Sequence, residues 1–494
     1  MEENKMSKGK EILAILFLTM VIGTGTLAWI VWSSKDNTKM NVTIGDLADV
    51  SFKTGNDINI SNLSPSFYYD DGALTEFSIR KKKGLTTELN TNIYLDITSI
   101  SDELKNDNFK YVLLSSSDGN TYNEVISSSF KDASVGKLDI VTDSPLTDGK
   151  TYYKFYIWID GNNENNETMQ GKSLKGTLNV DVSTPPVNAV TLVEGLDKGE
   201  TGDSGSGVYK VTHDAITAGS SATGSEIPAV TDYRYYGPNP NNYICLDMEG
   251  QSTCPDKHLY RIIGSIYEEK ENTNRIKVIK ATPLTDGTTK GYAWDSGNVN
   301  IWATITNGNY SNSLTSGASL MKLLNSGDWW NRTNTFANYG LTEKAKSYIT
   351  TSRYYLGGYN TSSGVMTNQF YAYERGTTRY DANRPLYWDG YVGLMYPSDY
   401  GYAAGNSCVT GTDPYNYAEG CKNKDWLYNS NIIQWLMSPD SGNSYNVFYV
   451  FRDGFVDRVS SYVALAVRPS FYLTSNTLIT NGDGSIDNPY LIGL

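Results

Sequence analysis

Short segments in which every second residue is apolar follow one another through residues 36–185, separated by clusters of Asn, Gly, Ser and Asp. This alternation puts apolar side chains on one face of an extended chain, so each segment predicts a half-buried β-strand. The apolar positions of three such segments are Ile93, Leu95 and Ile97, then Phe155, Ile157 and Ile159, and then Leu178, Val180 and Val182. Pro185 and Pro186 end the series because proline cannot donate to a strand ladder. We expect residues 36–185 to form an all-β sandwich.

The next segment, residues 186–231, is rich in Gly, Ser and Thr and includes GETGDSGSG and AGSSATGSE. Side chains this small offer little apolar area to offset the entropy that a chain loses when it becomes ordered. We therefore expect a flexible linker with one short strand at VYKVT (208–212).

Helical spacing of apolar residues begins after Asp232, together with further strands. SLMKLLNSGDWW (319–330) predicts one helix, and LTEKAKSYI (341–349) predicts a short helix that Thr342 opens, since threonine favours the N-cap position. YNVFYVF (445–451) and FVDRVS (455–460) flank Asp-Gly, a strong signal for a β-hairpin. ALAVRPSFYL (464–473) predicts one more strand. Residues 232–494 should thus form an α+β domain.

Residues Ile12–Trp32 contain no charged side chain, and as a helix they would span about 30 Å, the thickness of the hydrocarbon layer of a bilayer. Three lysines precede this stretch, which favours a cytoplasmic N-terminus. We expect residues 1–35 to be a cytoplasmic tail and a single-pass membrane anchor. A cleavable signal ending at Ala28 is the alternative. Both alternatives put the bulk of the chain outside the cell.

Composition narrows the set of partners. The 494-residue chain has a net charge of −13, and we find no extended basic face in its sequence, so nucleic acid is not an expected partner. Its 38 tyrosines combine an apolar ring with a polar hydroxyl, which suits contact surfaces as well as strand positions. Tyrosine is enriched where proteins contact partners, so exposed tyrosines would favour binding of another molecule.

Four cysteines fall into two local pairs, Cys245 with Cys254 and Cys408 with Cys421. An even number of cysteines outside the cell usually indicates disulfides. Zinc is the alternative, but neither pair has the CxxC spacing and the chain has only two histidines. We expect two disulfides, no metal and no other cofactor.

The stretch from GTGTLAWIVWSSKDN to YIWIDGNNENNETMQG resembles exported β-sandwich proteins of Gram-positive bacteria that are related to camelysin and to biofilm-fibre subunits. This resemblance implies a structural, fibre-forming or spacing role. The loop Asp160–Glu167 offers oxygen ligands at alternate positions, but Asn165 stands where an EF-hand loop has glycine. The loop is thus expected to be a solvated hairpin loop, with a calcium site as the alternative.

A second resemblance covers residues 232–494. Its motifs occur in the order NNYICLD, LYRIIG, IKVIK, LTEKAKSYI, VGLMYPSDYGYA, WLMSP, FYVFRDGFV, VRPSFYL and GDGSIDNPY. The series looks like a widespread, uncharacterised exported domain of gut Firmicutes and Mollicutes-like bacteria. It implies an extracellular domain and leaves the ligand open.

The ending of this domain, from WLMSP (435–439) to VRP (467–469), is similar to C-type-lectin-like folds, which include formylglycine-generating enzymes and the ligand-displaying proteins of diversity-generating retroelements. In those folds the segment between the two motifs shapes the ligand surface. The resemblance implies ligand contacts by Asn443, Tyr445, Asn446, Tyr449, Arg452, Asp457 and Arg458. It also implies structural roles for Trp435 and Arg468. The sequence lacks the signatures of calcium-dependent sugar binding, so a lectin activity would rest on the fold alone.

Catalytic motifs are incomplete in this chain. Ser319–Lys322 matches the Ser-x-x-Lys of penicillin-recognising enzymes and Ser444–Asn446 their Ser-x-Asn, but no lysine follows Lys424 to supply the third motif. GxSxG and HExxH do not occur. A glycosidase needs only two suitably spaced carboxylates, so a cell-wall glycosidase is the enzymatic alternative.

These patterns predict a membrane-anchored bacterial cell-surface protein, an adhesin or receptor, whose distal domain binds an extracellular carbohydrate or protein. A structural subunit of a surface fibre is the second hypothesis.

Overall fold

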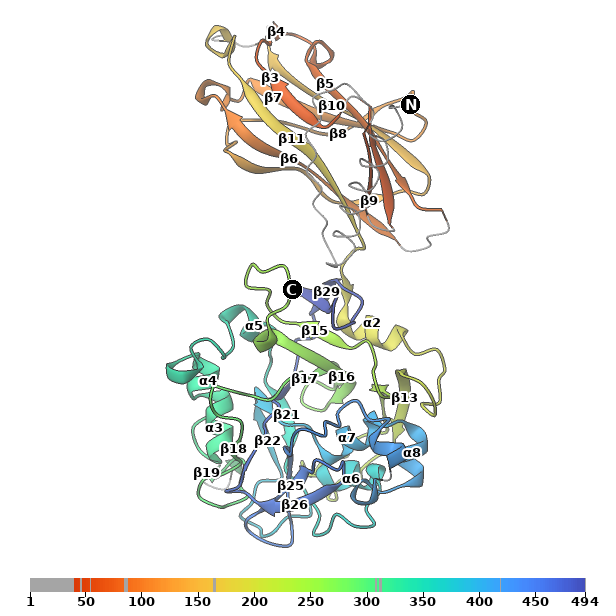
Figure 1. Cartoon of the computed structure of the whole chain (residues 1–494), viewed down its shortest axis with the longest axis vertical. Helices are drawn as coiled ribbons and strands as arrows, with labels where there is room; N and C mark the ends of the chain where they lie inside the picture. The colour runs from red at the N-terminus through yellow and green to blue at the C-terminus, as the bar shows by residue number, and fades with distance from the viewer. Residues whose placement is uncertain are drawn as a thin grey trace, which may run out of the picture. The chain divides into compact units, whose positions relative to one another are not determined.

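The computed structural model describes residues 40–44, 47–53, 55–83, 88–162, 166–306, 309–310, 313–417 and 419–493. The chain divides between Pro185 and Pro186 into two compact units, named here the sandwich unit and the C-terminal unit (Figure 1). Both are rich in strands, which confirms the predicted β-rich, multi-domain architecture. The predicted membrane segment Ile12–Trp32 lies outside the described residues. Within them, no helix has both the length and the apolar character that a bilayer crossing requires.

Two sheets form the sandwich unit. In the first, the strand order is β1 (Met40–Ile44), β2 (Ala48–Phe52), β5 (Ala73–Lys81), β10 (Lys150–Asp160), β7 (Phe109–Ser116) and β8 (Asn123–Ser129), with the short β4 (Pro65–Ser66) parallel to β10. In the second, the order is β3 (Asp57–Ile60), β11 (Leu174–Ser183), β6 (Leu89–Ile100) and β9 (Gly136–Leu146). The 3-10 turns η1 (Tyr69–Asp71), η2 (Asp102–Leu104) and η3 (Asn166–Met169) lie in the connections.

The apolar side chains at the predicted alternating positions form the core between these sheets. Leu95, Phe155 and Leu178 are fully buried and belong to one apolar cluster that both sheets line. The outward face of β10 differs from the prediction, because Tyr156 and Trp158 are also buried there. They form a small second cluster with apolar residues of the neighbouring β7. The first sheet therefore presents aromatic rings on its outer face as well.

A large sheet runs through the C-terminal unit. Its strand order is β12 (Val187–Asn188), β29 (Leu478–Asn481), β30 (Tyr490–Gly493), β15 (Tyr243–Cys245), β16 (Leu259–Glu268), β17 (Thr273–Lys280), β28 (Ser470–Tyr472) and β23 (Val392–Gly393). The remaining strands of this sheet are β13 (Gly207–His213) and β14 (Val230–Tyr236), which pair with each other, and β14 also pairs with β16. The core against this sheet is aromatic, with Trp294, Trp388 and Trp435 almost fully buried.

Smaller sheets and short helices surround the large sheet. The strand pairs are β18 (Tyr292–Ala293) with β27 (Ala464–Leu465), β19 (Ile305–Thr306) with β20 (Asn309–Tyr310), and β21 (Ser352–Tyr355) with β22 (Tyr387–Gly390), and a further sheet contains β24 (Gln434–Pro439), β25 (Asn446–Val450) and β26 (Val456–Ser460). The helices are α2 (Ala189–Gly195), α3 (Ser319–Asn325), α4 (Asp328–Asn331), α5 (Glu343–Ser347), α6 (Thr367–Glu374), α7 (Pro397–Ala403), α8 (Asn406–Gly411) and α9 (Glu419–Lys422). The 3-10 turns of this unit are η4 (Asp256–His258), η5 (Asn334–Phe336) and η6 (Pro414–Asn416).

Residues 186–231, predicted to be a flexible linker, are instead part of the C-terminal unit. β13 pairs with β14 along its whole length, and Val193 of α2 is fully buried in the main core. The Asn188 side chain caps α2 by accepting a hydrogen bond from the Val190 amide. The prediction failed because the few apolar residues of this segment occupy positions that face the core, which overall composition cannot reveal.

Local breaks alter two predicted elements of the C-terminal unit. The predicted helix 319–330 is interrupted at Gly327 and becomes α3 and α4. The predicted strand 464–473 is split into β27 and β28, with Pro469 between them, because proline has no amide hydrogen for a ladder. The predicted capping role of Thr342 is confirmed, since its hydroxyl accepts a hydrogen bond of 3.1 Å from the Ala345 amide at the start of α5.

Both predicted disulfides are present in the C-terminal unit. The Cα atoms are 5.9 Å apart in the Cys245–Cys254 bridge and 5.7 Å apart in the Cys408–Cys421 bridge. The first closes the segment after β15, and the second joins α8 to α9. Each bridge reduces the freedom of the unfolded chain and so stabilises the unit.

Candidate functional site

The seven predicted ligand-contact residues lie together on the sheet of β24, β25 and β26. Asn443 and Tyr445 lie in the loop before β25, Asn446 and Tyr449 on β25, Arg452 in the turn, and Asp457 and Arg458 on β26. The register places Tyr449 opposite Asp457. We call this sheet, with the loop 439–446, the turn 451–455 and the adjoining residues 461–462, the hairpin surface. Gly454 provides the positive φ of +92° that the turn requires.

Asp440 fixes the loop of the hairpin surface from inside. Its side chain is 1% exposed and accepts hydrogen bonds from the Gly442 amide (2.7 Å), from Asn443 Nδ2 (2.7 Å) and from Arg458 Nη1 (3.1 Å). Asn443 Oδ1 in turn accepts hydrogen bonds from the amides of Tyr445 (3.0 Å) and Asn446 (2.6 Å). Two predicted ligand residues, Asn443 and Arg458, are thus occupied in holding the loop. Both side chains remain partly exposed while they do so.

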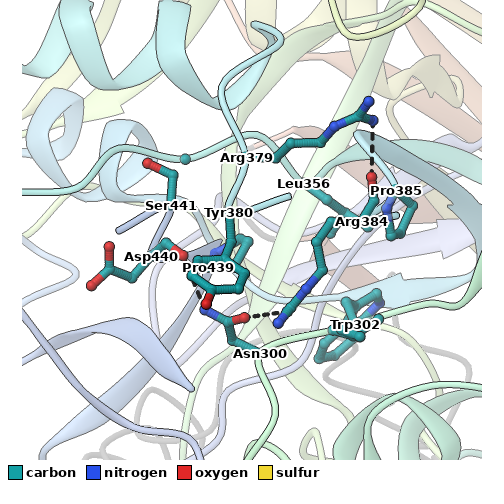
Figure 2. Close-up of a pocket in the computed structure, with 12 residues that line it drawn as sticks. Asn300, Trp302, Leu356, Arg379, Tyr380, Arg384, Pro385, Pro439, Asp440 and Ser441 are labelled. Carbon is teal, nitrogen blue, oxygen red and sulfur yellow. Dashed lines mark hydrogen bonds between the residues drawn. The ribbon is translucent and has the colours of Figure 1, made fainter. Parts of the chain in front are cut away.

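A small cavity lies next to this loop, and Figure 2 shows the side chains around it. Asn300 Nδ2 donates to the carbonyl oxygens of Asp440 (3.0 Å), Asn443 (3.1 Å) and Asn446 (2.7 Å). Arg384 donates to Asn300 Oδ1 and to the Ser444 carbonyl. The cavity measures about 20 Å³, enough for about one water molecule. A larger ligand must therefore bind on the surface outside it.

Three exposed tyrosines lie in the cavity wall or on segments bonded to the neighbouring loop. Tyr380, Tyr445 and Tyr462 have exposed fractions of 46%, 42% and 58%. The Arg384 guanidinium lies 5.4 Å from the centre of the Tyr380 ring and bonds the residue before Tyr445. The Ser461 amide donates to the Tyr445 carbonyl at 2.9 Å, which brings Tyr462 close to Tyr445. The sequence motif pointed to Tyr445 only, since Tyr380 comes from a distant loop and Tyr462 lies beyond β26.

A second aromatic group extends along the turn of the hairpin surface. The ring centres of Phe451 and Phe455 are 4.9 Å apart, those of Tyr449 and Phe451 are 6.3 Å apart, and those of Tyr415 and Phe455 are 6.3 Å apart. The Arg452 guanidinium lies 5.4 Å from the Phe451 ring. Burial raises the pKa of Tyr449, and the charge of Asp457 adds to this effect. Aromatic rings beside a cation and a carboxylate can bind by stacking and by hydrogen bonding.

The sequence motifs missed a larger groove in the same unit. It has a volume of about 560 Å³ and lies between β13 and the helices α6 and α8. Its walls include the buried rings of Tyr209 and Tyr402, with Lys210, Asn368 and Asn406 at its polar edge. One wall belongs to the segment predicted as a linker, which explains why the pattern gave no signal for it.

Buried charged residues lie behind the Tyr402 ring. Asp232 bonds His213 Nε2 (2.9 Å) and Arg234 Nη2 (2.7 Å), and Arg234 Nη1 donates to Asp399 (3.0 Å). The Arg234 guanidinium lies 4.7 Å from the Tyr402 ring. Burial opposes the ionisation of Asp232, but the charge of Arg234 and the hydrogen bond with His213 outweigh it and lower the pKa of Asp232. Burial lowers the pKa of His213. These groups are paired with one another, as in a structural network.

The described residues give no geometric support to a metal site. Among them, His, Cys, Asp and Glu side chains do not gather in groups of three or more that could hold an ion. Asp160, at the start of the loop considered for calcium, instead accepts a hydrogen bond of 2.6 Å from Lys110 Nζ. Residues 163–165 of that loop lie outside the described part of the chain.

No protein-family model matches this chain, and a search of curated proteins finds no relative of it.

Proposed function

We propose that this protein is a membrane-anchored bacterial cell-surface protein whose C-terminal unit binds an extracellular carbohydrate or protein through the hairpin surface. The observation that carries the proposal is the set of exposed tyrosines around a loop that buried polar groups hold in one conformation. Exposed rings on a fixed backbone offer contact area with little loss of conformational entropy on binding. Membrane anchoring rests on the uncharged stretch Ile12–Trp32.

A C-type-lectin-like fold is part of the same proposal. Two features of the C-terminal unit support it. Trp435 is 1% exposed and its indole nitrogen donates to the Tyr292 carbonyl at 2.9 Å, while Arg468 is 5% exposed and donates to the Lys280 carbonyl at 2.8 Å. The two motifs thus tie the ends of the hairpin segment into the core, and the segment between them contributes both core residues such as Phe448 and exposed residues such as Tyr445.

Two edge strands of the sandwich unit, β8 and β9, argue against a fibre built by adding strands at these edges. β8 is an edge strand whose side chains are mostly exposed and polar. β9, another edge strand, contains exposed Asp139, Pro145 within its length, and register shifts against β6. Charges, proline and bulges at a sheet edge all oppose pairing with a second chain. We therefore favour ligand binding over the fibre hypothesis.

The hairpin surface gives little support to the glycosidase alternative. Among the described residues that line its cavity, the one carboxylate is Asp440, which is 1% exposed and accepts several hydrogen bonds from its own loop. In a glycosidase, both carboxyl groups of the catalytic pair must reach the same sugar ring. Asp440 is positioned to hold the loop and not to contact a substrate.

A glycan array and a protein array, probed with the full-length chain in detergent micelles, would test ligand binding by the hairpin surface. We expect specific signals that fall at least tenfold for the double variant Tyr445→Ala/Tyr462→Ala, because two exposed rings are lost. Tyr339→Ala removes a ring that is 36% exposed outside the hairpin surface and serves as the matched control. Specific signals that the double variant keeps in full would refute the assignment of the site, and arrays without any specific signal would refute ligand binding.

Protease treatment of intact cells would test the proposed location. We expect the protein to be cut at the cell surface and fragments of both units to be released. All four cysteines should resist a membrane-impermeant maleimide reagent until a reductant is added, because they form disulfides. A chain that survives the protease on intact cells but is digested after lysis would contradict surface exposure.

A further inference from the structure

Aromatic side chains are exposed on the sandwich unit, far in sequence from the hairpin surface. Phe67 and Tyr68 have exposed fractions of 68% and 69%, and Tyr69 is 40% exposed. Together with Trp158 of β10 they line an open depression of about 320 Å³. We call these four residues the aromatic platform. The depression is at the lower end of the size range of small-molecule sites.

The backbone under the platform is fixed by several contacts. β4 pairs with Ile159 and Asp160 of β10, and the Gly161 amide donates to the Ser66 carbonyl at 2.8 Å. Ser66 Oγ donates to Asp71 at 2.5 Å and accepts a hydrogen bond of 3.1 Å from the Tyr68 amide. These bonds hold the segment that carries Phe67 and Tyr68 in one position.

Gly72 allows the turn η1 to lie directly on β10. A Cβ atom at this position would approach the Ile157 carbonyl oxygen to 2.4 Å, so any other residue would push the turn away. A segment held this closely keeps its rings exposed in a fixed arrangement. Such an arrangement lowers the entropy cost of binding.

The platform continues into buried rings. The Tyr69 ring lies 5.2 Å from Tyr156 and 6.1 Å from Trp158, in both cases edge to face. Tyr156 and Trp158 are themselves 7% and 8% exposed and pack on β7. The Tyr69 ring therefore rests on a buried aromatic base, and rings packed edge to face shape this part of the sheet's outer face.

Polar groups at the edge of the platform indicate the chemistry of its ligand. The remaining described lining residues are Asp70, Asp160 and Asn162, so the described lining contains two carboxylates and no cation. Asp160 is engaged by Lys110 and Asn162, while the side chain of Asp70 is exposed. Carboxylates next to the rings disfavour an anionic ligand. They also disfavour insertion of the rings into a bilayer, where the charges would lose water.

We propose that the aromatic platform binds a neutral saccharide. A pyranose ring has an apolar C–H face that packs on aromatic rings, and hydroxyls at its edge that donate to carboxylate and amide oxygens. Phe67 and Tyr68 supply the exposed rings, Trp158 the floor, and Asp70 the acceptor. The sandwich unit then has a binding role of its own, independent of the hairpin surface.

Calorimetric titration of the full-length chain in detergent micelles with chitohexaose, and separately with cellohexaose, tests this proposal. We expect binding of at least one oligosaccharide. The double variant Phe67→Ala/Tyr68→Ala should bind it about tenfold more weakly or worse, and Asp70→Asn about threefold more weakly, because the carboxylate acceptor is lost. Tyr339→Ala, which removes a ring 36% exposed on the other unit and outside the hairpin surface, should bind like the wild type.

Three results would overturn the proposal. The first is a wild-type chain that binds neither oligosaccharide, and the second is equal binding by the wild type and the double variant. The third comes from a fluorophore attached to the variant Tyr68→Cys. Quenching of this fluorophore by brominated lipids in liposomes would assign the platform to a membrane. Thermal unfolding curves of all variants should match the wild type, since the replaced side chains are exposed. The hairpin-surface variants test the other unit, so either proposal can fail alone.

Discussion

Glu374 has almost no contact with solvent, and its carboxylate accepts hydrogen bonds from the Ser398 amide (2.9 Å), from Ser398 Oγ (2.6 Å) and from Arg375 (3.1 Å). Burial nevertheless outweighs these partners and raises its pKa to about 7. The protein therefore holds a proton on Glu374 at a pH where the unfolded chain releases it.

A pH dependence of stability follows from this shift. Between the ordinary glutamate pKa of about 4.5 and the folded value of about 7, the folded state binds more protons than the unfolded state, so the free energy of unfolding decreases as pH rises. The Glu374→Gln variant cannot ionise, and its stability curve should lack a downward slope of up to about 1 kcal/mol per pH unit in this window. Urea unfolding of both proteins at pH 5, 6 and 7 measures the difference. Parallel curves would contradict the assigned shift.

Exposure also decides the role of each tyrosine. Tyr260, Tyr354 and Tyr400 are fully buried core residues, whereas Tyr68 and Tyr462 are largely exposed. The residue type is the same, and no local pattern separates the two groups. The high number of tyrosines was therefore only a partial guide to contact surfaces, because many of these tyrosines are core residues.

At the scale of elements, the loop between β24 and β25 depends on Asp440. The variant Asp440→Ala would leave the donors of Gly442, Asn443 and Arg458 without this buried acceptor. We expect a loss of about 2–4 kcal/mol in the free energy of unfolding. Thermal or urea unfolding checks this value. Asp453→Ala, in the exposed turn of the same sheet, is the control and should change stability by less than about 0.5 kcal/mol. Equal effects of the two substitutions would argue against the structural role of Asp440.

The sequence placed many elements correctly for local reasons. Alternating positions predicted β6, β10 and β11, and Asp-Gly predicted the hairpin of β25 and β26. The misplaced elements have local causes too. Gly327 interrupts a helical pattern, and Pro469 interrupts an extended one. Both residues lay within runs whose apolar spacing outweighed them in the prediction.

At the scale of the whole molecule, each unit has its own apolar core. We therefore predict two transitions in differential scanning calorimetry of the full-length chain. Leu95→Ala, in the core of the sandwich unit, should lower one transition by about 5 °C or more, and Leu436→Ala, in the core of the C-terminal unit, should lower the other. If both transitions moved together in either variant, the units would be one cooperative body.

The sequence by itself determined the β-rich, multi-domain architecture, the two cysteine pairs and the hairpin that carries the predicted ligand residues. Each of these depends on residues close together along the chain. Only the tertiary structure decided that residues 186–231 are ordered, that Asn443 and Arg458 support a loop, and which tyrosines reach the surface. The physical reason is sequence distance. Asn300 donates a hydrogen bond to the Asp440 carbonyl, although the two residues are 140 positions apart in the sequence. Contacts of this kind determine which residues are buried, and a local sequence pattern does not show them.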